Sequence, residues 1–248
     1  GGIAIISRDC LYYEYILDDL KNKNVKNICT FGESEEANSR LICYSLGKDT
    51  SLSYVVNSNR VDLIIPSLLP KHQAVNFAAC LAVASSLKLD LDSASKPLKF
   101  FDPGNGRGKI IQVQKNSNKF EIICDYYNAN PASVRAALQY LKIIEHRKKV
   151  IILGDMLELG VDSLKLHLDL YPALIGIMAT KILLVGTHVK IIADLLPKSC
   201  YVRSFINVEE LMVELFDILK DGELILIKGS RSIGLDRIMQ YFDQVIEG

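Results

Sequence analysis

The sequence predicts an α/β protein, because short apolar runs alternate with segments of helical period through most of its 248 residues. Runs such as 150–154 (VIILG) are apolar at consecutive positions, which is typical of parallel strands covered by helices on both faces. From about residue 120 the alternation is regular. We therefore interpret residues 115–248 as a doubly wound, Rossmann-like domain with about five strands.

The first half predicts a second, less regular α/β domain over residues 1–114. Its apolar runs predict strands at 1–7, 27–32, 52–56 and 61–68, and helical spacing predicts helices at 10–22 and 73–89. A further apolar run, 108–114, closes this domain, and the polar, turn-prone segment 115–119 (KNSNK) is the expected linker.

The second domain is expected to alternate strands and helices to its end. Strands are expected at 120–124, 150–154, 181–186, 201–205 and 223–229. Helices are expected at 131–145, 162–177, 189–196, 208–220 and 234–247, and Pro131 suits the first turn of its helix.

Composition limits the classes of partner. Lys plus Arg and Asp plus Glu balance at 29 each, so no overall charge favours nucleic acid or a membrane surface. No uncharged run is long enough to span a membrane. The six cysteines are scattered without a C-x-x-C pair, which favours reduced thiols in the cytoplasm. We expect a monomer. Because the chain enters a strand-like run at once, with no initiator Met, we also expect it to be part of a larger protein.

Polar side chains gather at residues 125–130, between an apolar run and the helix expected from Pro131. The carboxyl ends of parallel strands are where such sheets bind ligands. Asp125 offers acceptors for ribose hydroxyls, and Tyr127 offers a ring that can flank a base. Asn128 and Asn130 offer both donors and acceptors. Alternatively, these asparagines only cap the following helix, and the sequence leaves both interpretations open.

Two more strands end in clusters of glycine with charged or hydroxyl groups. Residues 152–160 (ILGDMLELG) carry Asp155 and Glu158. Residues 226–236 (LIKGSRSIGLD) carry Lys228, Ser230 and Arg231, and the two cations would lie at a helix N-terminus, which favours anions. The alternative for each cluster is a glycine turn with solvated charges.

The first domain offers weaker signals. His72 and Asn76 are four residues apart on one expected helix face, although a histidine on an apolar helix is more often structural. Residues 104–109 (GNGRGK) lack the strand-then-helix setting of a phosphate loop, but they can present Arg107 on a turn. The sequence contains no G-x-x-x-x-G-K-[ST] motif, no zinc-type His/Cys spacing and no G-x-S-x-G motif.

In order, the strings DYYNANPASVRAAL, ILGDMLELG and LIKGSRSIGLDRI resemble the C-terminal domain of the Mur ligases, most closely the members that add D-alanyl-D-alanine. KHQAVNFAACLAVA and GRGKIIQV resemble the closing part of that family's central ATPase domain. Three departures from the family pattern stand out, namely Ser7-Arg8-Asp9-Cys10 for N-x-D-D, Gln73 for Asn, and Cys124 for an acid.

The resemblance implies an ATP-dependent ligase that joins D-alanyl-D-alanine to UDP-N-acetylmuramoyl-tripeptide through an acyl phosphate, in peptidoglycan precursor synthesis. It also implies that the phosphate loop and the Mg²⁺ ligands lie upstream, so this chain alone is expected to be inactive. The alternatives are another ATP-dependent amino-acid ligase of the Mur and folylpolyglutamate superfamily, or a non-catalytic binding module. The NANP and KGSRS strings argue against a different ligase.

The resemblance also implies residue roles. On the nucleotide side, it places Asn76 at the adenine, Arg107 at the phosphates and Asp125 at the ribose, with Tyr127, Asn128 and Asn130 shaping the same edge. His72 is expected among the residues that bind the nucleotide. Near the dipeptide it places Asp155, Glu158, Lys228, Ser230 and Arg231. The expected catalytic cations are Arg107, Lys228 and Arg231.

Overall fold

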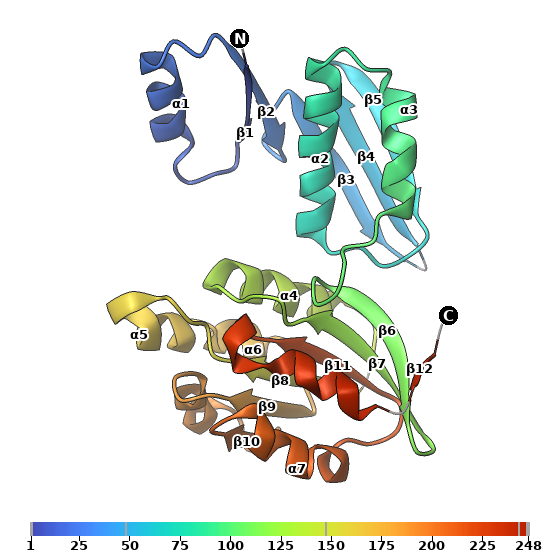
Figure 1. Cartoon of the computed structure of the whole chain (residues 1–248), viewed down its shortest axis with the longest axis vertical. Coiled ribbons are helices and arrows are strands. Elements are labelled where there is room, and N and C mark those ends of the chain that lie inside the picture. The colour runs from blue at the N-terminus through green and yellow to red at the C-terminus, as the bar shows by residue number, and fades with distance from the viewer. Residues whose placement is uncertain (1, 48, 147, 243, 247–248) are drawn as a thin grey trace. The chain divides into compact units, whose positions relative to one another are not determined.

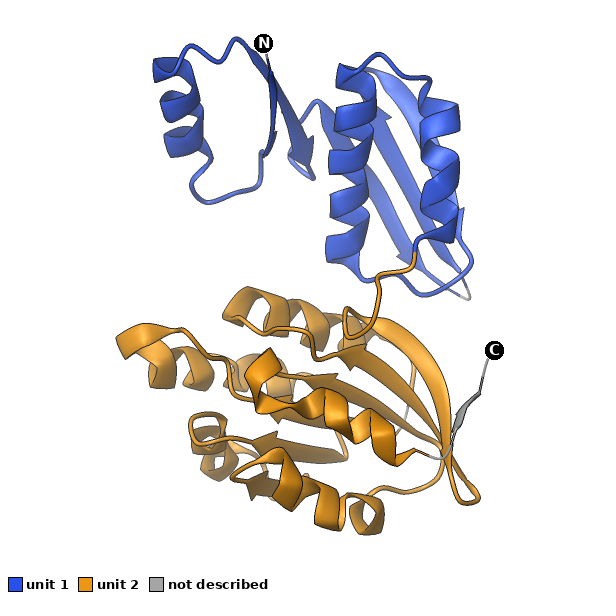
Figure 2. Cartoon of the chain, in the orientation of Figure 1, with its two compact units in different colours: residues 1–101 blue, residues 102–248 orange. Residues whose placement is uncertain are grey.

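The structure is a computed structural model that describes residues 2–47, 49–146, 148–242 and 244–246 (Figure 1). The chain forms two compact units, residues 1–101 and 102–248 (Figure 2). Each unit has its own sheet and its own buried apolar cluster. The expected mixed α/β fold class is therefore confirmed. No helix in the described ranges is both long and apolar enough to cross a membrane.

Unit 1 is a five-stranded sheet, as far as its residues are described, in the order β1-β2-β3-β4-β5. The first three strands are parallel and the last three antiparallel. The strands are β1 (Ile3–Ser7), β2 (Asn27–Gly32), β3 (Ser39–Leu46), β4 (Thr50–Val56) and β5 (Asn59–Ile65). The helices are α1 (Tyr13–Asn22), α2 (Lys71–Ser86), α3 (Leu91–Ser95) and the 3-10 helix η1 (Lys96–Phe100).

The core of unit 1 lies between the sheet and α2, which packs against β1 to β4 (Figure 1). Phe77, Ala78 and Leu81 of α2 are buried against Tyr54 and Leu63. The sequence pattern did not predict β3. A register shift between Leu41 and Cys43 interrupts its pairing with β4, so β3 lacks a clean two-residue alternation of buried and exposed side chains.

Unit 2 contains a seven-stranded sheet, within its described residues, in the order β10-β9-β8-β11-β7-β6-β12. The strands from β10 to β7 are parallel, and β6 and β12 are antiparallel to their neighbours. The bounds are β6 (Lys109–Lys115), β7 (Asn118–Asp125), β8 (Lys149–Gly154), β9 (Lys181–Val185), β10 (Tyr201–Phe205), β11 (Glu223–Lys228) and β12 (Gln244–Ile246). The five parallel strands are those that the sequence predicted.

Helical segments cover both faces of this sheet (Figure 1). Ile122 and Ile225 point to the face packed by α7 and η5, whereas Ile123 and Leu226 alternate with them along the strands and are buried outside that cluster. The helix α4 contacts β11 and α6. The helices are α4 (Pro131–Ile143), η2 (Gly160–Asp162), α5 (Ser163–Leu168), α6 (Tyr171–Ile175), η3 (Val189–Leu195), α7 (Val208–Ile218), η4 (Arg231–Ile233) and η5 (Leu235–Tyr241).

The boundary between the units differs from the expected one at 114/115. The chain divides between 101 and 102, and 115–119 is the turn region of the β6–β7 hairpin rather than a linker. The buried side chain of Val113 on β6 belongs to the core of unit 2. Because β6 pairs along its whole length with β7, this strand and the preceding turn with Arg107 belong to unit 2 and not to the first domain.

The last expected helix also differs in the structure, both along its length and at its start. The helix expected at 234–247 is the short 3-10 helix η5, followed by the strand β12, which pairs with β6; residues 243 and 247 lie outside the described part. The helix N-terminus expected at Arg231 is only a three-residue 3-10 turn, η4, closed by Gly234. So short a turn has no appreciable helix dipole. The preference for anions expected there therefore rests on the charges of Lys228 and Arg231 alone.

Candidate functional site

Three motif loops meet at the carboxyl edge of the sheet in unit 2. The strand β11 lies between β7 and β8, and Lys228 at its end is opposite Asp125 on β7 and Leu153 on β8. The loops that follow these strands carry the three strings singled out in the sequence. Since parallel strands end at the same edge, the topology alone brings these distant segments together.

Lys228 is buried at the centre of this junction, with a side chain only 2% exposed. Its Nζ lies 3.0 Å from Oδ2 of Asp125 and donates to the backbone oxygen of Asn128 at 3.0 Å and to that of Asp125 at 3.4 Å. The ammonium has three donors and all three have acceptors in one loop. In this structure Lys228 therefore holds the Asp125–Asn128 loop, and its expected catalytic role stays a prediction.

Ser230 ties the same loop to the one after β8. Its Oγ accepts from the backbone N–H of Leu157 at 2.9 Å and lies 3.4 Å from the backbone oxygen of Ala129. Its own N–H donates to the backbone oxygen of Asp155 at 3.0 Å. The residue is only 5% exposed, so its side chain connects the two loops, and its expected contact with the dipeptide stays a prediction.

Asp155 is also turned inward, and its expected place beside the dipeptide stays a prediction. Its carboxylate accepts from the backbone N–H groups of Thr187, His188 and Val189 at 2.9, 3.1 and 2.6 Å, and the residue is 3% exposed. Such donors offset the cost of taking a carboxylate out of water. Glu158, by contrast, is exposed and lies at the tip of its loop with φ of 62°.

His167 completes this inner network, and the sequence analysis missed it. Its Nε2 accepts from the backbone N–H of Met156 at 2.9 Å and its Nδ1 lies 2.7 Å from the backbone oxygen of Ser163, so the ring is neutral with its proton on Nδ1. Burial lowers the pKa of His167, although nearby Asp155 opposes this. The only sequence signal was a histidine among the apolar residues of a short helix.

The exposed part of the edge carries two arginines around one aromatic ring. The guanidinium carbon of Arg107 lies 4.3 Å from the centroid of Tyr127, and that of Arg231 lies 5.2 Å from it. The backbone N–H of Tyr127 donates to the oxygen of Gly106 at 2.9 Å, which holds the Arg107 turn against the loop. Arg107 thus joins the Asp125 loop within one unit.

The two asparagines differ. Asn130 is the N-cap of α4, where its side chain accepts from the N–H of Ser133 at 2.8 Å and the Ser133 hydroxyl accepts from the N–H of Asn130. This is the capping interpretation that the sequence left open. Asn128 is exposed, and its Oδ1 accepts from the N–H of Ala129 at 2.8 Å. A nucleotide contact of either side chain stays a prediction.

Cys124 stands where the family pattern has an acid, but it does not supply the negative charge of an acid. It is buried on β7, and burial raises the pKa of its thiol to about 12, so it stays neutral. Asp125 is therefore the one carboxylate of the strand end 124–125. His72 and Asn76 lie exposed on α2 in unit 1, four residues apart as expected, and their contacts with the nucleotide stay a prediction.

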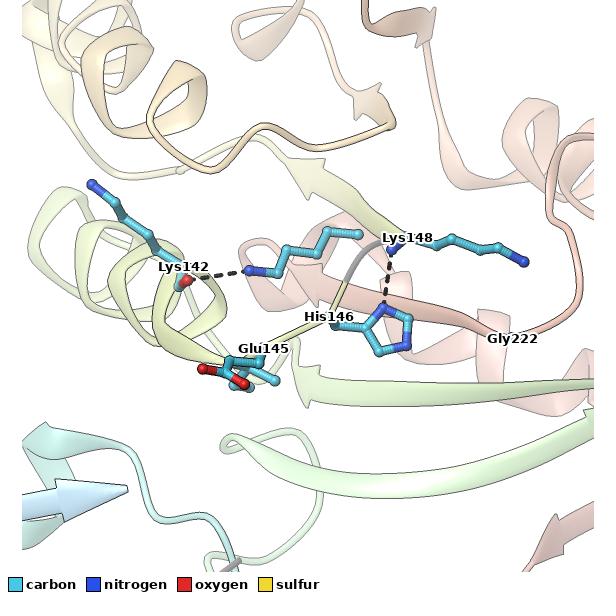
Figure 3. A pocket seen from close by; sticks show the side chains of 7 residues that line it. Lys142, Glu145, His146, Lys148 and Gly222 are labelled. Atoms are coloured by element: carbon cyan, nitrogen blue, oxygen red, sulfur yellow. Dashed lines mark hydrogen bonds between the residues drawn. The ribbon is translucent and has the colours of Figure 1, made fainter. Parts of the chain in front are cut away.

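A hollow of about 670 Å³ lies at the opposite, amino-terminal edge of the sheet (Figure 3). Basic residues line much of it, but the ammonium groups of two of them donate hydrogen bonds to backbone oxygens. Nζ of Lys149 donates to the oxygen of Lys142 at 3.2 Å, and Nζ of Lys148 donates to that of Asp221 at 3.1 Å. The side chains of Lys142 and Lys148 point in opposite directions (Figure 3). This hollow is therefore not a convergent anion site.

Comparison with known proteins adds to this geometry. The sequence pattern of the Mur ligase, glutamate ligase domain matches residues 106–231, which span all three motif loops and the turn with Arg107. The chain belongs to the Mur ligase family. The family resemblance drawn from the motifs is thereby confirmed.

The chain is 42% identical over 243 residues to the UDP-N-acetylmuramoyl-tripeptide–D-alanyl-D-alanine ligase of Rickettsia prowazekii, covering 98% of this chain and 53% of that relative. MurF from Acinetobacter baumannii matches in structure with a TM-score of 0.78 and 26% identity, over 96% of this chain and 51% of that one. MurF from Thermotoga maritima, solved in complex with ADP, matches with a TM-score of 0.71 and 21% identity, over 96% and 53% of the two chains. The chain spans about half the length of these relatives.

Proposed function

We propose that the intact protein is an ATP-dependent ligase that adds D-alanyl-D-alanine to UDP-N-acetylmuramoyl-tripeptide in peptidoglycan precursor synthesis. The observation that carries the proposal is the junction at the carboxyl edge of unit 2. There, Lys228 and Ser230 join the loops of all three family strings, and Arg107, Tyr127 and Arg231 are exposed beside them. The names of the relatives, which include this ligase from Rickettsia prowazekii and MurF from Acinetobacter baumannii, support the choice of substrate.

The residues of this edge suit a reaction in which negative charge builds up. Bound ATP supplies the phosphoryl group that activates the terminal carboxylate of the tripeptide as an acyl phosphate. Arg107 and Arg231 bring two permanent cations to the edge, where they can stabilise phosphate and carboxylate oxygens. The buried contacts of Lys228 and Ser230 hold the loops in place, so that little reorganisation is needed when substrates bind.

The chemistry of the edge fits a nucleotide. Asp125 has a side chain 16% exposed, so its carboxylate is accessible in part to a ribose hydroxyl, and Arg107 provides the cation that phosphates need. The complex of Thermotoga maritima MurF with ADP agrees with this choice. Mg²⁺ is part of the proposal as well. The described residues contain no group of three or more His, Cys, Asp or Glu ligands, and we place its ligands elsewhere in the intact protein.

We propose that the intact protein works in the cytoplasm. ATP is abundant there, and all six cysteines of the chain are free thiols, as expected in a reducing compartment. The alternatives are a related ligase that adds another amino acid, or a binding module without catalysis. The similarity to D-alanyl-D-alanine ligases along 98% of the chain favours the dipeptide over a single amino acid.

The proposal is tested by a ligation assay on the intact protein with UDP-N-acetylmuramoyl-tripeptide, ATP and Mg²⁺. Phosphate release and product formation are expected with D-alanyl-D-alanine and not with D-alanine, D-glutamate or a diamino acid. Turnover with a single amino acid would point to a sister ligase. Absence of any ATP-dependent ligation would favour the binding module.

A further inference from the structure

His188 lies at the same edge of the sheet as the three motif loops, although none of the three motif strings contains it. It follows β9, which is paired with β8, and β8 is paired with β11. Leu184, Leu153 and Lys228 are level with one another across these strands. Since neighbouring strands are about 4.8 Å apart, the end of β9 lies about 10 Å from the end of β11.

Asp155 connects His188 to the loop that carries Arg231. Oδ2 of Asp155 lies 3.3 Å from Nδ1 of His188, and the same carboxylate accepts from the backbone N–H of His188 at 3.1 Å. The backbone oxygen of Asp155 accepts from the N–H of Ser230, the residue before Arg231, at 3.0 Å. One buried residue therefore fixes both the imidazole of His188 and the start of the loop with the cation.

The contact with Asp155 determines which nitrogen of the ring carries the proton. An ionised carboxylate only accepts, so Nδ1 of His188 is the donor and Nε2 has a lone pair. Among the residues that the structure describes, none forms a hydrogen bond to Nε2, and the side chain is 42% exposed. The titratable groups that face the ring are Asp155 and His167, whose neutral ring is stacked on it with centroids 5.8 Å apart. An exposed imidazole oriented by a buried carboxylate has the arrangement of a proton acceptor.

Formation of an amide bond requires such an acceptor. The neutral amine of the dipeptide carries two protons on its nitrogen, and the amide keeps one. The carboxylates of Asp125 and Asp155 are already engaged, the first by Lys228 and the second by backbone N–H groups. Carboxylates are also weaker bases than imidazole, by about two pKa units. An imidazole is therefore better suited to this step near neutral pH.

We propose that Nε2 of His188 accepts the proton that the amine of D-alanyl-D-alanine loses when it attacks the acyl phosphate. This role rests on the proposed function, which supplies the amine and the acyl phosphate. The C–N bond forms, the phosphate leaves with the electron pair of its bond to the acyl carbon, and the proton passes from the amine nitrogen to Nε2. Asp155 stabilises the resulting imidazolium, which returns the proton to water.

The test compares His188→Gln with the unchanged intact protein in the ligation assay, over a pH series at saturating D-alanyl-D-alanine. Glutamine keeps a donor for Asp155 but has no basic nitrogen, so we expect kcat to fall about 100-fold while KM for the dipeptide stays nearly the same. The decline of kcat in acid that is expected of the unchanged protein should be absent from His188→Gln. Added imidazole should restore part of the rate in His188→Ala. His146→Gln, at a histidine on the opposite edge of the sheet, is the matched control and should keep kcat.

Two further measurements separate this role from a structural one. Circular dichroism and thermal melts show whether each variant is folded. NMR of the ring nitrogens in the 248-residue chain, at mildly alkaline pH, is expected to find the proton of His188 on Nδ1 and none on Nε2. The opposite tautomer, or a folded His188→Gln with kcat within about threefold of the unchanged protein, would overturn the inference and leave the proposed function intact. Absence of ligation by the unchanged protein would overturn both, so the two failures are distinguishable.

Discussion

Lys228 connects β11 to the Asp125–Asn128 loop through one ion pair and two hydrogen bonds to backbone oxygens. Lys228→Met keeps the length of the side chain but leaves the Asp125 carboxylate without its cation. Because that carboxylate is 16% exposed and water can replace part of the lost interaction, we expect a loss of about 2–3 kcal/mol in the free energy of unfolding.

The measurement is urea denaturation followed by circular dichroism. Lys165→Met, at an exposed lysine on α5, is the control and should change the unfolding free energy by less than about 0.5 kcal/mol. If both variants were equally stable, the buried contacts of Lys228 would not hold the loop.

His167 makes the stability of the same unit depend on pH. Burial lowers its pKa below the usual 6.5, and its Nε2 must stay unprotonated to accept from Met156. Its contribution to stability is therefore complete above about pH 6.5 and is lost as the pH falls toward the lowered pKa. We expect unfolding free energies between pH 5 and 7 to fall with acid by up to about 1.4 kcal/mol per pH unit from this group.

The check on this prediction compares pH series of two variants. His167→Gln should flatten the slope, whereas His72→Gln, at an exposed histidine on α2, should keep the slope of the unchanged chain. An unchanged slope in His167→Gln would assign the acid sensitivity to another group.

At the scale of elements, the turn before β6 depends on glycine at a specific place. Gly104 and Gly106 both have positive φ, at 76° and 73°, so alanine strains the backbone at either position. Only at Gly106 would the added Cβ also lie 2.8 Å from the ring of Tyr126. We expect Gly104→Ala to cost about 1 kcal/mol, and Gly106→Ala about 2–3 kcal/mol in addition to a displaced Arg107.

Thermal melts measure the two costs, and the NMR signals of Arg107 and Tyr127 report the displacement. Gly104→Ala is the matched control, since its Cβ would meet no atom within 4 Å. Similar costs and unchanged arginine signals in both variants would show that the turn adjusts freely around Tyr126.

At the scale of the whole molecule, the position of the unit boundary has a direct consequence. A fragment of residues 102–248 keeps β6, which covers the edge of β7 and buries Val113, so it is expected to fold by itself. A fragment of residues 115–248 loses that strand and exposes an apolar edge that pairs with other chains. We expect the longer fragment to be monomeric and the shorter one to be less stable and to aggregate.

Size-exclusion chromatography and urea denaturation of both fragments provide the measurement. The full chain of 248 residues, which contains both boundaries, is the reference for stability and oligomeric state. If residues 115–248 were as stable and monomeric as 102–248, β6 would not belong to unit 2, and the boundary expected from the polar segment 115–119 would be the better one.

The sequence by itself determined the elements whose signals are local. The consecutive apolar residues of β8 and β11 predicted buried parallel strands, and the order of three motif strings predicted the family and the sheet edge where they meet. The sequence also indicated, as one of two alternatives, that Asn130 caps the following helix, because capping depends on neighbouring residues. The sequence could not predict the interruption in β3 or the pairing of β6, because both depend on partner strands.

Only the tertiary structure decided which way the polar residues of those strings point. Lys228, Ser230 and Asp155 share the composition of a binding loop with Arg107 and Arg231, yet the first three are buried and the other two are exposed. The difference arises because hydrogen bonds to segments more than 30 residues away satisfy the buried groups, as between Asp155 and Thr187 or between Ser230 and Leu157. The residue pattern of one segment does not show which distant group is its hydrogen-bond partner. The fold determines that partner, because it brings the ends of several strands together at one edge of the sheet.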